Sequence, residues 1–423
     1  MAAVYYDLSE LFLASSPKFK YYGISRTVME VGYELAISDA DVRFVIFSPA
    51  HERFFEVTPR IGALSPTGIL DLGLPRSATP KRMRYGFPQP NWLRDLIYPI
   101  VQWGVRKVNL RRWRNVPAGM VKDTNLDGQI LVSLGRPKIM ADYLIAMDRA
   151  GVSIRLNPLL HDMFPLYGSA HLRQRTFTAN FIYDNCIVIS HAERILSNSA
   201  FTKSEIERLS ASGHLPPTPQ VIAVPLSHEL RLTDEPVVQT GPAEPYLLSI
   251  GTMTGRKNLE CILDAMMHLH ETHCSVPPFV LAGARRKRTE KYIKQSRFDP
   301  IRSRIHVVLN PNHAELRRLY EHALALVIPS RMEGWGLPLG EALWLGTPGL
   351  ASTATALKEV GGDLAEYFDP DDPQALSGRV DRLQSEPERY SALKARLKTA
   401  RPELRPWKDV ARDILSETGA AQG

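Results

Sequence analysis

The sequence predicts an α/β protein with two domains, each built on a doubly wound parallel sheet. The first observation is size, because 423 residues with 44% hydrophobic side chains favour two or three domains with sizeable cores. The second is alternation: apolar runs of strand length, such as 246–250, 279–283 and 324–328, are separated by stretches with helical periodicity. Such alternation is typical of a parallel sheet with helices on both faces.

A proline-rich stretch, residues 232–245, divides the chain and is predicted to be a linker. We therefore expect a first domain at 1–235 and a second at 241–400, followed by a final amphipathic helix at 405–420. In the first domain, strands are predicted at 4–6, 42–47, 130–132, 154–157 and 221–226, and helices at 28–36 and 140–149.

Bulk properties limit the function without deciding it. The three cysteines, Cys186, Cys261 and Cys274, are scattered and odd in number, which favours neither a disulfide framework nor a zinc site and fits a reducing compartment. The start of the chain does not resemble a signal peptide, and no window reaches the ~18 apolar residues of a membrane span. The net charge of +7 suits anionic substrates, membranes or nucleic acid.

The segment 76–114 differs from the rest in composition. It carries ten Lys or Arg residues against one acid, Asp95, and six aromatic residues. From Trp92 to Trp113 apolar positions recur at helical spacing, so a basic amphipathic helix is predicted. It can bind a membrane surface, with Trp92, Trp103 and Trp113 as anchors, or pack on the domain with a solvated basic face. Nucleic-acid stacking is a distant third, because no nucleic-acid module accompanies the segment.

A glycine-punctuated loop follows the apolar run at 324–329. Gly334 and Gly336 allow close approach of the backbone to a ligand, and Pro338 suits a first helical position. The free N–H groups of a helix N-terminus attract an anion. Glu333 lies in this loop and Glu341 about one turn into the helix, where two carboxylates can each hold hydroxyl groups. The structural alternative is an ordinary helix N-terminus with acidic residues near its dipole.

Two further stretches combine polar residues with predicted strand ends. After the strand at 246–250, Arg256 and Lys257 precede a helix that Asn258 can cap, which makes a diphosphate site. The alternative there is a solvated charge pair in a turn. His161 and Asp162 follow another apolar run, at the edge where open α/β sheets place ligands. A loop histidine satisfied by its neighbour is the alternative.

These motifs together resemble a known family. The segment from Glu333 to Glu341 resembles the donor-site motif of family 4 retaining glycosyltransferases, which have the GT-B fold. The segments 251–258, 23–26 and 161–165 resemble further motifs of that family, and 186–203 is similar to its strand–helix–strand–turn. The resemblance implies two Rossmann-like domains facing a cleft, with the final helix returning to the first domain.

The resemblance also implies residue roles. Arg256 and Lys257 would stabilise a leaving diphosphate, Glu333 would hold the sugar hydroxyls and Glu341 the ribose. His161 would line the reaction centre. The remaining implied contacts are Gly23, Gly334, Trp335, Gly336 and Leu337 on the donor side, and Arg26 and Asp162 on the acceptor side.

The implied activity is transfer of a hexose with retention, mannose being favoured, to a sugar or lipid-linked saccharide in bacterial surface polysaccharide or glycolipid synthesis. The donor would be a nucleotide-diphosphate sugar, with GDP-mannose favoured and a UDP-sugar as the alternative. We expect no cofactor, no metal, and a cytoplasmic protein peripheral on the inner face of the cell membrane. The rivals are a non-catalytic nucleotide-sugar-binding scaffold and a glycosidase using Glu333 and Glu341.

Overall fold

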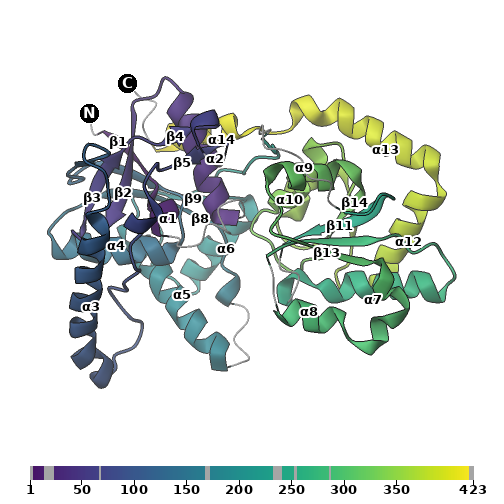
Figure 1. The fold of residues 1–423 in the computed structure, drawn as a ribbon, viewed down its shortest axis with the longest axis horizontal. Coiled ribbons are helices and arrows are strands. Elements are labelled where there is room, and N and C mark those ends of the chain that lie inside the picture. Colours follow the sequence, from purple (N-terminus) through teal and green to yellow (C-terminus); the bar gives the residue numbers. More distant parts are fainter. Residues whose placement is uncertain are drawn as a thin grey trace. The chain divides into compact units, whose positions relative to one another are not determined.

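The structure is a computed structural model that describes residues 3–13, 23–65, 68–166, 172–231, 241–251, 255–284 and 287–418. The chain forms two compact units, the first comprising residues 1–225 with 408–423 and the second residues 226–407 (Figure 1). Most of the proline-rich stretch, residues 232–240, lies outside the described ranges.

The first unit is organised around an eight-stranded sheet with the order β10-β9-β8-β7-β1-β2-β3-β6. Its pairs are parallel except at one edge, where β3 runs antiparallel to both β2 and β6. A second, two-stranded sheet pairs β4 with β5. The strands are β1 (Val4–Asp7), β2 (Val42–Ser48), β3 (Arg53–Val57), β4 (Arg60–Ile61), β5 (Leu70–Asp71), β6 (Val121–Asp123), β7 (Ile130–Ser133), β8 (Arg155–Leu160), β9 (Ile195–Ser197) and β10 (Val221–Ala223).

Helices of the first unit are α1 (Ser9–Leu13), α2 (Gly23–Ile37), α3 (Trp92–Trp113), α4 (Pro137–Arg149), α5 (Leu172–His191) and α6 (Ala200–Ala211), together with most of α14 (Trp407–Glu417). Strand β1 is buried along its whole length, and the Tyr6 hydroxyl donates to the Val28 carbonyl at 3.0 Å, which ties α2 to the sheet. The helix predicted from Trp92 to Trp113 is α3.

The first strand of the strand–helix–strand–turn implied for 186–203 is wrong. Residues 186–190 form the last part of α5 rather than a strand. A short apolar run cannot be assigned by periodicity alone, and here the helix that begins at Leu172 continues through it.

The second unit contains a six-stranded, fully parallel sheet with the order β13-β12-β11-β14-β15-β16. Helices α7 and α12 pack on the same side of a core with Leu247, Phe279 and Val327, and Figure 1 shows α9 and α10 on the other side. The strands are β11 (Tyr246–Ile250), β12 (Phe279–Gly283), β13 (Ile305–Leu309), β14 (Ala323–Ile328), β15 (Gly349–Ser352) and β16 (Ala365–Phe368). The helices are α7 (Leu259–Glu271), α8 (Lys287–Ile293), α9 (His313–His322), α10 (Leu337–Trp344), α11 (Leu357–Gly361), α12 (Pro373–Ser385) and α13 (Pro387–Ala400).

Each sheet has one point at which the chain reverses the direction of strand addition. In the first unit this point lies between β1 and β7, and in the second between β11 and β14. Open α/β sheets bind ligands outside the carboxyl ends of the strands at such a switch point. The fold therefore indicates one candidate position in each unit.

Candidate active site

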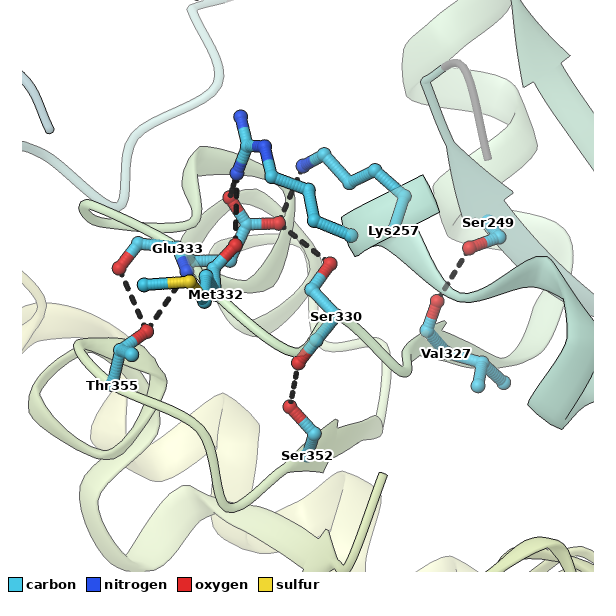
Figure 2. A network of polar contacts seen from close by, with 9 residues as sticks. Ser249, Lys257, Val327, Ser330, Met332, Glu333, Ser352 and Thr355 are labelled. Atoms are coloured by element: carbon cyan, nitrogen blue, oxygen red, sulfur yellow. Dashed lines mark hydrogen bonds and ion pairs between the residues drawn. The ribbon is translucent and has the colours of Figure 1, made fainter. Parts of the chain in front are cut away.

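At the switch point of the second sheet, the loops after β11 and β14 bring Arg256, Lys257 and Glu333 together (Figure 2). Lys257 donates to Oε1 of Glu333, and Ser330 donates to the same oxygen at 2.7 Å. Arg256 donates to Oε2 of Glu333 at 3.4 Å and to the Met332 carbonyl at 2.8 Å. One carboxylate is thus shared by both predicted cations.

The Glu333 carboxyl is buried, with 8% of its side chain exposed. Burial favours the neutral form, but the charges of Lys257 and Arg256 and the hydrogen bonds from Lys257 and Ser330 outweigh it and lower the pKa of Glu333. Glu333 is therefore a fixed negative charge between two cations. Two donors already occupy Oε1, whereas Oε2 has an acceptor position left for a hydroxyl group.

The backbone around Glu333 is held from a neighbouring loop. The Thr355 hydroxyl accepts from the Glu333 amide and donates to the Glu333 carbonyl, both at 2.8 Å. The Ser352 hydroxyl, at the end of β15, donates to the Ser330 carbonyl. These contacts fix the loop before a ligand arrives, which is what a preorganised site requires.

Asn258 is not the side-chain helix cap that we predicted. It has a left-handed backbone, with φ of 57°, and its side chain makes no capping hydrogen bond to α7. Instead its Nδ2 donates to the carbonyls of Pro329 (3.1 Å) and Pro370 (2.7 Å), and its Oδ1 accepts from Arg331 at 2.7 Å. Because Asn258 joins three loops, it holds the segment that carries Arg256 and Lys257.

Glu341 lies one turn into α10 and is buried, and the Tyr320 hydroxyl donates to its Oε2 at 2.6 Å. The helix begins at Leu337, so Pro338 is its second residue rather than the first residue that the sequence predicts. Gly336 precedes the helix with a φ of 110°, which would strain any residue with a side chain. Trp335 is buried, and its indole N–H donates to the Ser227 carbonyl at 3.4 Å, so the indole nitrogen is already occupied.

His161 follows β8 in the first unit. Its Nε2 lies 2.7 Å from the Leu134 carbonyl and must donate to it, which leaves Nδ1 as the acceptor nitrogen of the neutral ring. Burial lowers the pKa of His161, partly opposed by the Leu134 hydrogen bond and the charge of Glu10. The imidazole is therefore neutral at neutral pH.

Other predicted residues of the first unit lie in different surroundings. Gly23 is the exposed first residue of α2, with φ of 58°. Arg26 is buried beside Glu30 of the same helix, with Nε 3.5 Å from its carboxylate, so it is part of the packed interior. Asp162 is half-buried next to His161.

Sequence reasoning missed several residues that complete these sites. Ser330, Thr355 and Tyr320 contact the predicted glutamates, and Glu10 binds Arg136 at the switch point of the first sheet, with 2.7 Å between Oε1 and Nη2. Except for Ser330, which is three residues from Glu333, their partners are distant in sequence, so no local pattern marks them. Serine after the strand at 324–328 was the one available signal.

Comparison with known proteins identifies this part of the chain. Residues 233–399 match the family described as "Glycosyl transferases group 1". The second unit belongs to the group 1 glycosyltransferases. The matched residues include Arg256, Lys257 and Glu333, which the structure gathers at the switch point, and Glu341 in α10.

Curated proteins similar to this chain include two mannosyltransferases. O-antigen chain mannosyltransferase B of Escherichia coli is 30% identical over 223 residues, which are 47% of this chain and 52% of that protein. MMP alpha-(1->4)-mannosyltransferase of Mycolicibacterium hassiacum is 33% identical over 131 residues, 30% of this chain and 31% of that protein. The chain thus matches half of the first relative's length and less of the second.

Solved structures resemble the chain over its whole length. Sucrose-phosphate synthase from Thermosynechococcus elongatus has a TM-score of 0.64 at 15% identity, covering 99% of this chain and 98% of that one. Anabaena HepE in complex with UDP and glucose has a TM-score of 0.58 at 14% identity, covering 100% of both. At these identities the likeness shows the fold, which is GT-B, as predicted.

Proposed function

We propose that this protein is a retaining, metal-independent mannosyltransferase that takes its sugar from a nucleotide diphosphate. GDP-mannose is the favoured donor and a UDP-sugar the alternative. The acceptor is a sugar or lipid-linked saccharide in the synthesis of a bacterial surface polysaccharide or glycolipid. The observation that carries this proposal is the Arg256–Glu333–Lys257 cluster at the switch point, in a domain related to mannosyltransferases.

The cluster provides the charges that such a transfer needs. Arg256 and Lys257 would bind the departing diphosphate, which is the charge stabilisation that a metal supplies in other enzymes. Glu333 would hold sugar hydroxyls through Oε2, and Glu341 the ribose. The acceptor hydroxyl would attack the anomeric carbon on the face that the diphosphate leaves, with its proton passing to the leaving phosphate oxygen. No side-chain nucleophile is then required.

The decisive experiment offers purified protein a panel of nucleotide sugars with and without EDTA. We expect consumption of GDP-mannose, release of the nucleoside diphosphate and α-configured product, at the same rate in EDTA. Activity lost in EDTA and restored by Mn²⁺ or Mg²⁺ would contradict the metal-independent mechanism.

The two rivals make different predictions for the same assay. A binding scaffold would retain the donor without turnover. A glycosidase would hydrolyse a simple glycoside and needs one carboxyl that stays protonated. Glu333 is a poor candidate for that acid because its pKa is lowered by Lys257 and Arg256 despite its burial.

We also propose that α3 binds an anionic membrane surface. Its most exposed apolar residues, Trp92, Leu96, Ile100 and Trp103, are 60–79% exposed and follow one another at helical spacing along one side. Most of the side that contacts the unit is held by polar side chains. Tyr98 and Gln102 donate to the Arg84 carbonyl at 3.0 and 2.9 Å, and Asn109 donates to the Lys81 carbonyl at 2.9 Å.

An exposed apolar side differs from a helix that packs its apolar side on a protein core, and this supports the membrane proposal over a solvated basic face. Trp113 is also not a membrane anchor as predicted, because its ring packs on Phe55 with 4.7 Å between centroids. Trp92 and Trp103 remain the interfacial candidates. No helix in the described part of the chain is both long and apolar enough to cross a bilayer, so association through α3 would be peripheral.

A further inference from the structure

A second group of cations lies at the switch point of the first sheet. Arg136 and Lys138 flank Pro137, where α4 begins after β7. Arg82 comes from the loop before α3, a loop that Tyr85 and Arg84 fasten to Asp142 of α4 and Asp184 of α5. The group therefore combines side chains from three separate parts of the unit.

Two of these cations form no ion pair with a described residue, although Asp142 and Asp184 act on both electrostatically. Arg136 is paired with Glu10, and Arg84 with Asp184. Arg82 makes no hydrogen bond or ion pair with any described residue, and its Nη2 is buried. The exposed side chain of Lys138 likewise has no such partner in the described ranges. A buried guanidinium N–H without an acceptor costs stability.

The surroundings make the missing partner an anion. Burial lowers the pKa of Lys138, and the charges of Arg82 and Arg84 lower it further. Burial also raises the pKa of Asp142 to about 6, against the opposing charges of Arg84 and Arg82, and its Oδ1 already accepts from the Tyr85 amide. In addition, Arg136 and Lys138 lie at the positive end of the α4 dipole, and the first turn of α4 contains no acid. The neighbouring cations and the positive end of the α4 dipole repel one another, and a bound anion would relieve this repulsion.

The place of the cluster connects it with the proposed reaction. Leu134, whose carbonyl accepts from His161, immediately precedes Gly135 and Arg136 on the loop after β7. Glu10 interacts electrostatically with both His161 and Arg82. The cluster and His161 thus lie at one edge of one sheet, whereas Arg256 and Lys257 belong to the other unit.

We propose that Arg82 and Lys138, at the start of α4, bind a phosphate ester of the acceptor. Arg82 offers a planar pair of N–H donors and Lys138 a point charge, a combination suited to phosphate oxygens. The proposal rests on the proposed function in that the ligand is the acceptor. The phosphate belongs either to a soluble sugar phosphate or to a lipid-linked saccharide.

The test measures binding of mannose 6-phosphate, with mannose as the matched ligand without phosphate. Arg82→Gln and Lys138→Gln should each weaken mannose 6-phosphate binding about tenfold, the scale of a charge-assisted hydrogen bond, and leave mannose unaffected. Lys122→Gln, which removes an exposed cation on the edge strand β6, is the control and should bind as wild type. Arg82→Lys keeps the charge but not the fork, and should bind between wild type and Arg82→Gln.

A second arm uses vesicles of equal parts phosphatidylcholine and phosphatidic acid. A loss of binding in Arg82→Gln with the sugar phosphate assigns the site to a soluble acceptor, and a loss with the vesicles alone assigns it to a lipid-borne phosphate. Unchanged binding of both probes in folded Arg82→Gln and Lys138→Gln overturns the proposal. Donor consumption without acceptor is measured on wild type separately. If it is absent while phosphate binding still depends on Arg82, the transferase proposal fails and the anion site stands.

Discussion

The Glu333 carboxylate holds Lys257 and Arg256 in place before any donor enters, and this arrangement explains why each cation should matter individually. We expect Arg256→Ala or Lys257→Ala to lower kcat/KM by roughly 10²–10³, the scale for removal of one preorganised charge stabiliser. Lys294→Ala, which removes an exposed cation elsewhere in the same unit, is the control. Near-normal turnover in both variants would eliminate the diphosphate-clamp argument.

The two glutamates should differ in which substrate part they affect. Glu333→Gln keeps the shape but removes the charge shared by the cations, so transfer should fall while nucleoside diphosphate binding stays nearly intact. Glu341→Gln should weaken nucleoside diphosphate binding, since Glu341 is assigned to the ribose. Calorimetric titration with GDP measures both. Equal losses of GDP affinity in the two variants would show that the roles are misassigned.

Single residues of the donor site were predictable where the chemistry is local. Arg256 and Lys257 are adjacent in sequence, and Glu333 lies in a glycine-punctuated loop, so the local sequence marked them as candidates and the family resemblance implied their roles. The role of Asn258 was not predictable, because its partners Pro329 and Pro370 are 71 and 112 residues away. A side chain that joins distant loops leaves no local pattern.

Among the elements, helices and strands with clear periodicity were found, and those set by tertiary packing were not. The apolar spacing from Trp92 to Trp113 predicted α3, but not which side would face the protein. That choice depends on the backbone acceptors of Arg84 and Lys81, which only the folded loop presents. The strand predicted at 186–190 is wrong for a related reason, since α5 extends through this apolar run.

Helix α4 should show a conflict between stability and binding. Lys138 lies at the positive end of the helix, where a cation is unfavourable. We therefore expect Lys138→Gln to raise the free energy of unfolding by about 0.3–1 kcal/mol at low ionic strength while it weakens phosphate binding. Chemical denaturation of wild type, Lys138→Gln and Lys122→Gln provides the measurement. A destabilised Lys138→Gln would mean that the lysine has a structural partner.

At the scale of the whole molecule, each unit carries cations at the switch point of its own sheet. In the second unit Arg256 and Lys257 share Glu333, whereas in the first unit no described carboxylate forms an ion pair with Arg82 or Lys138. Doubly wound parallel sheets were predictable from the alternation of strands and helices, and the GT-B fold from the resemblance of the motifs to family 4 glycosyltransferases. The antiparallel edge of the first sheet was not, because β3 and β6 fall at 53–57 and 121–123, where no motif was recognised.

The exposed apolar side of α3 leads to a prediction for the full chain. Wild-type protein should float with vesicles of phosphatidylcholine and phosphatidylglycerol at low salt, because bases such as Arg111 and Arg114 each add about 1 kcal/mol near an anionic surface. The double variant Leu96→Gln with Ile100→Gln should lose binding by more than about tenfold, since burying each side chain contributes about 1.5–3 kcal/mol.

The matched control is Val307→Gln with Leu309→Gln, which removes two exposed apolar side chains from the edge strand β13. This control should float as wild type does, and high salt should weaken both equally, because the charges of α3 are intact in each. Flotation of the α3 variant at the wild-type level would remove the helix from the membrane proposal. The membrane proposal would also fail if wild-type protein did not bind vesicles and instead sedimented as a dimer that Leu96→Gln with Ile100→Gln abolishes. The apolar side would then be covered by a second copy of the chain.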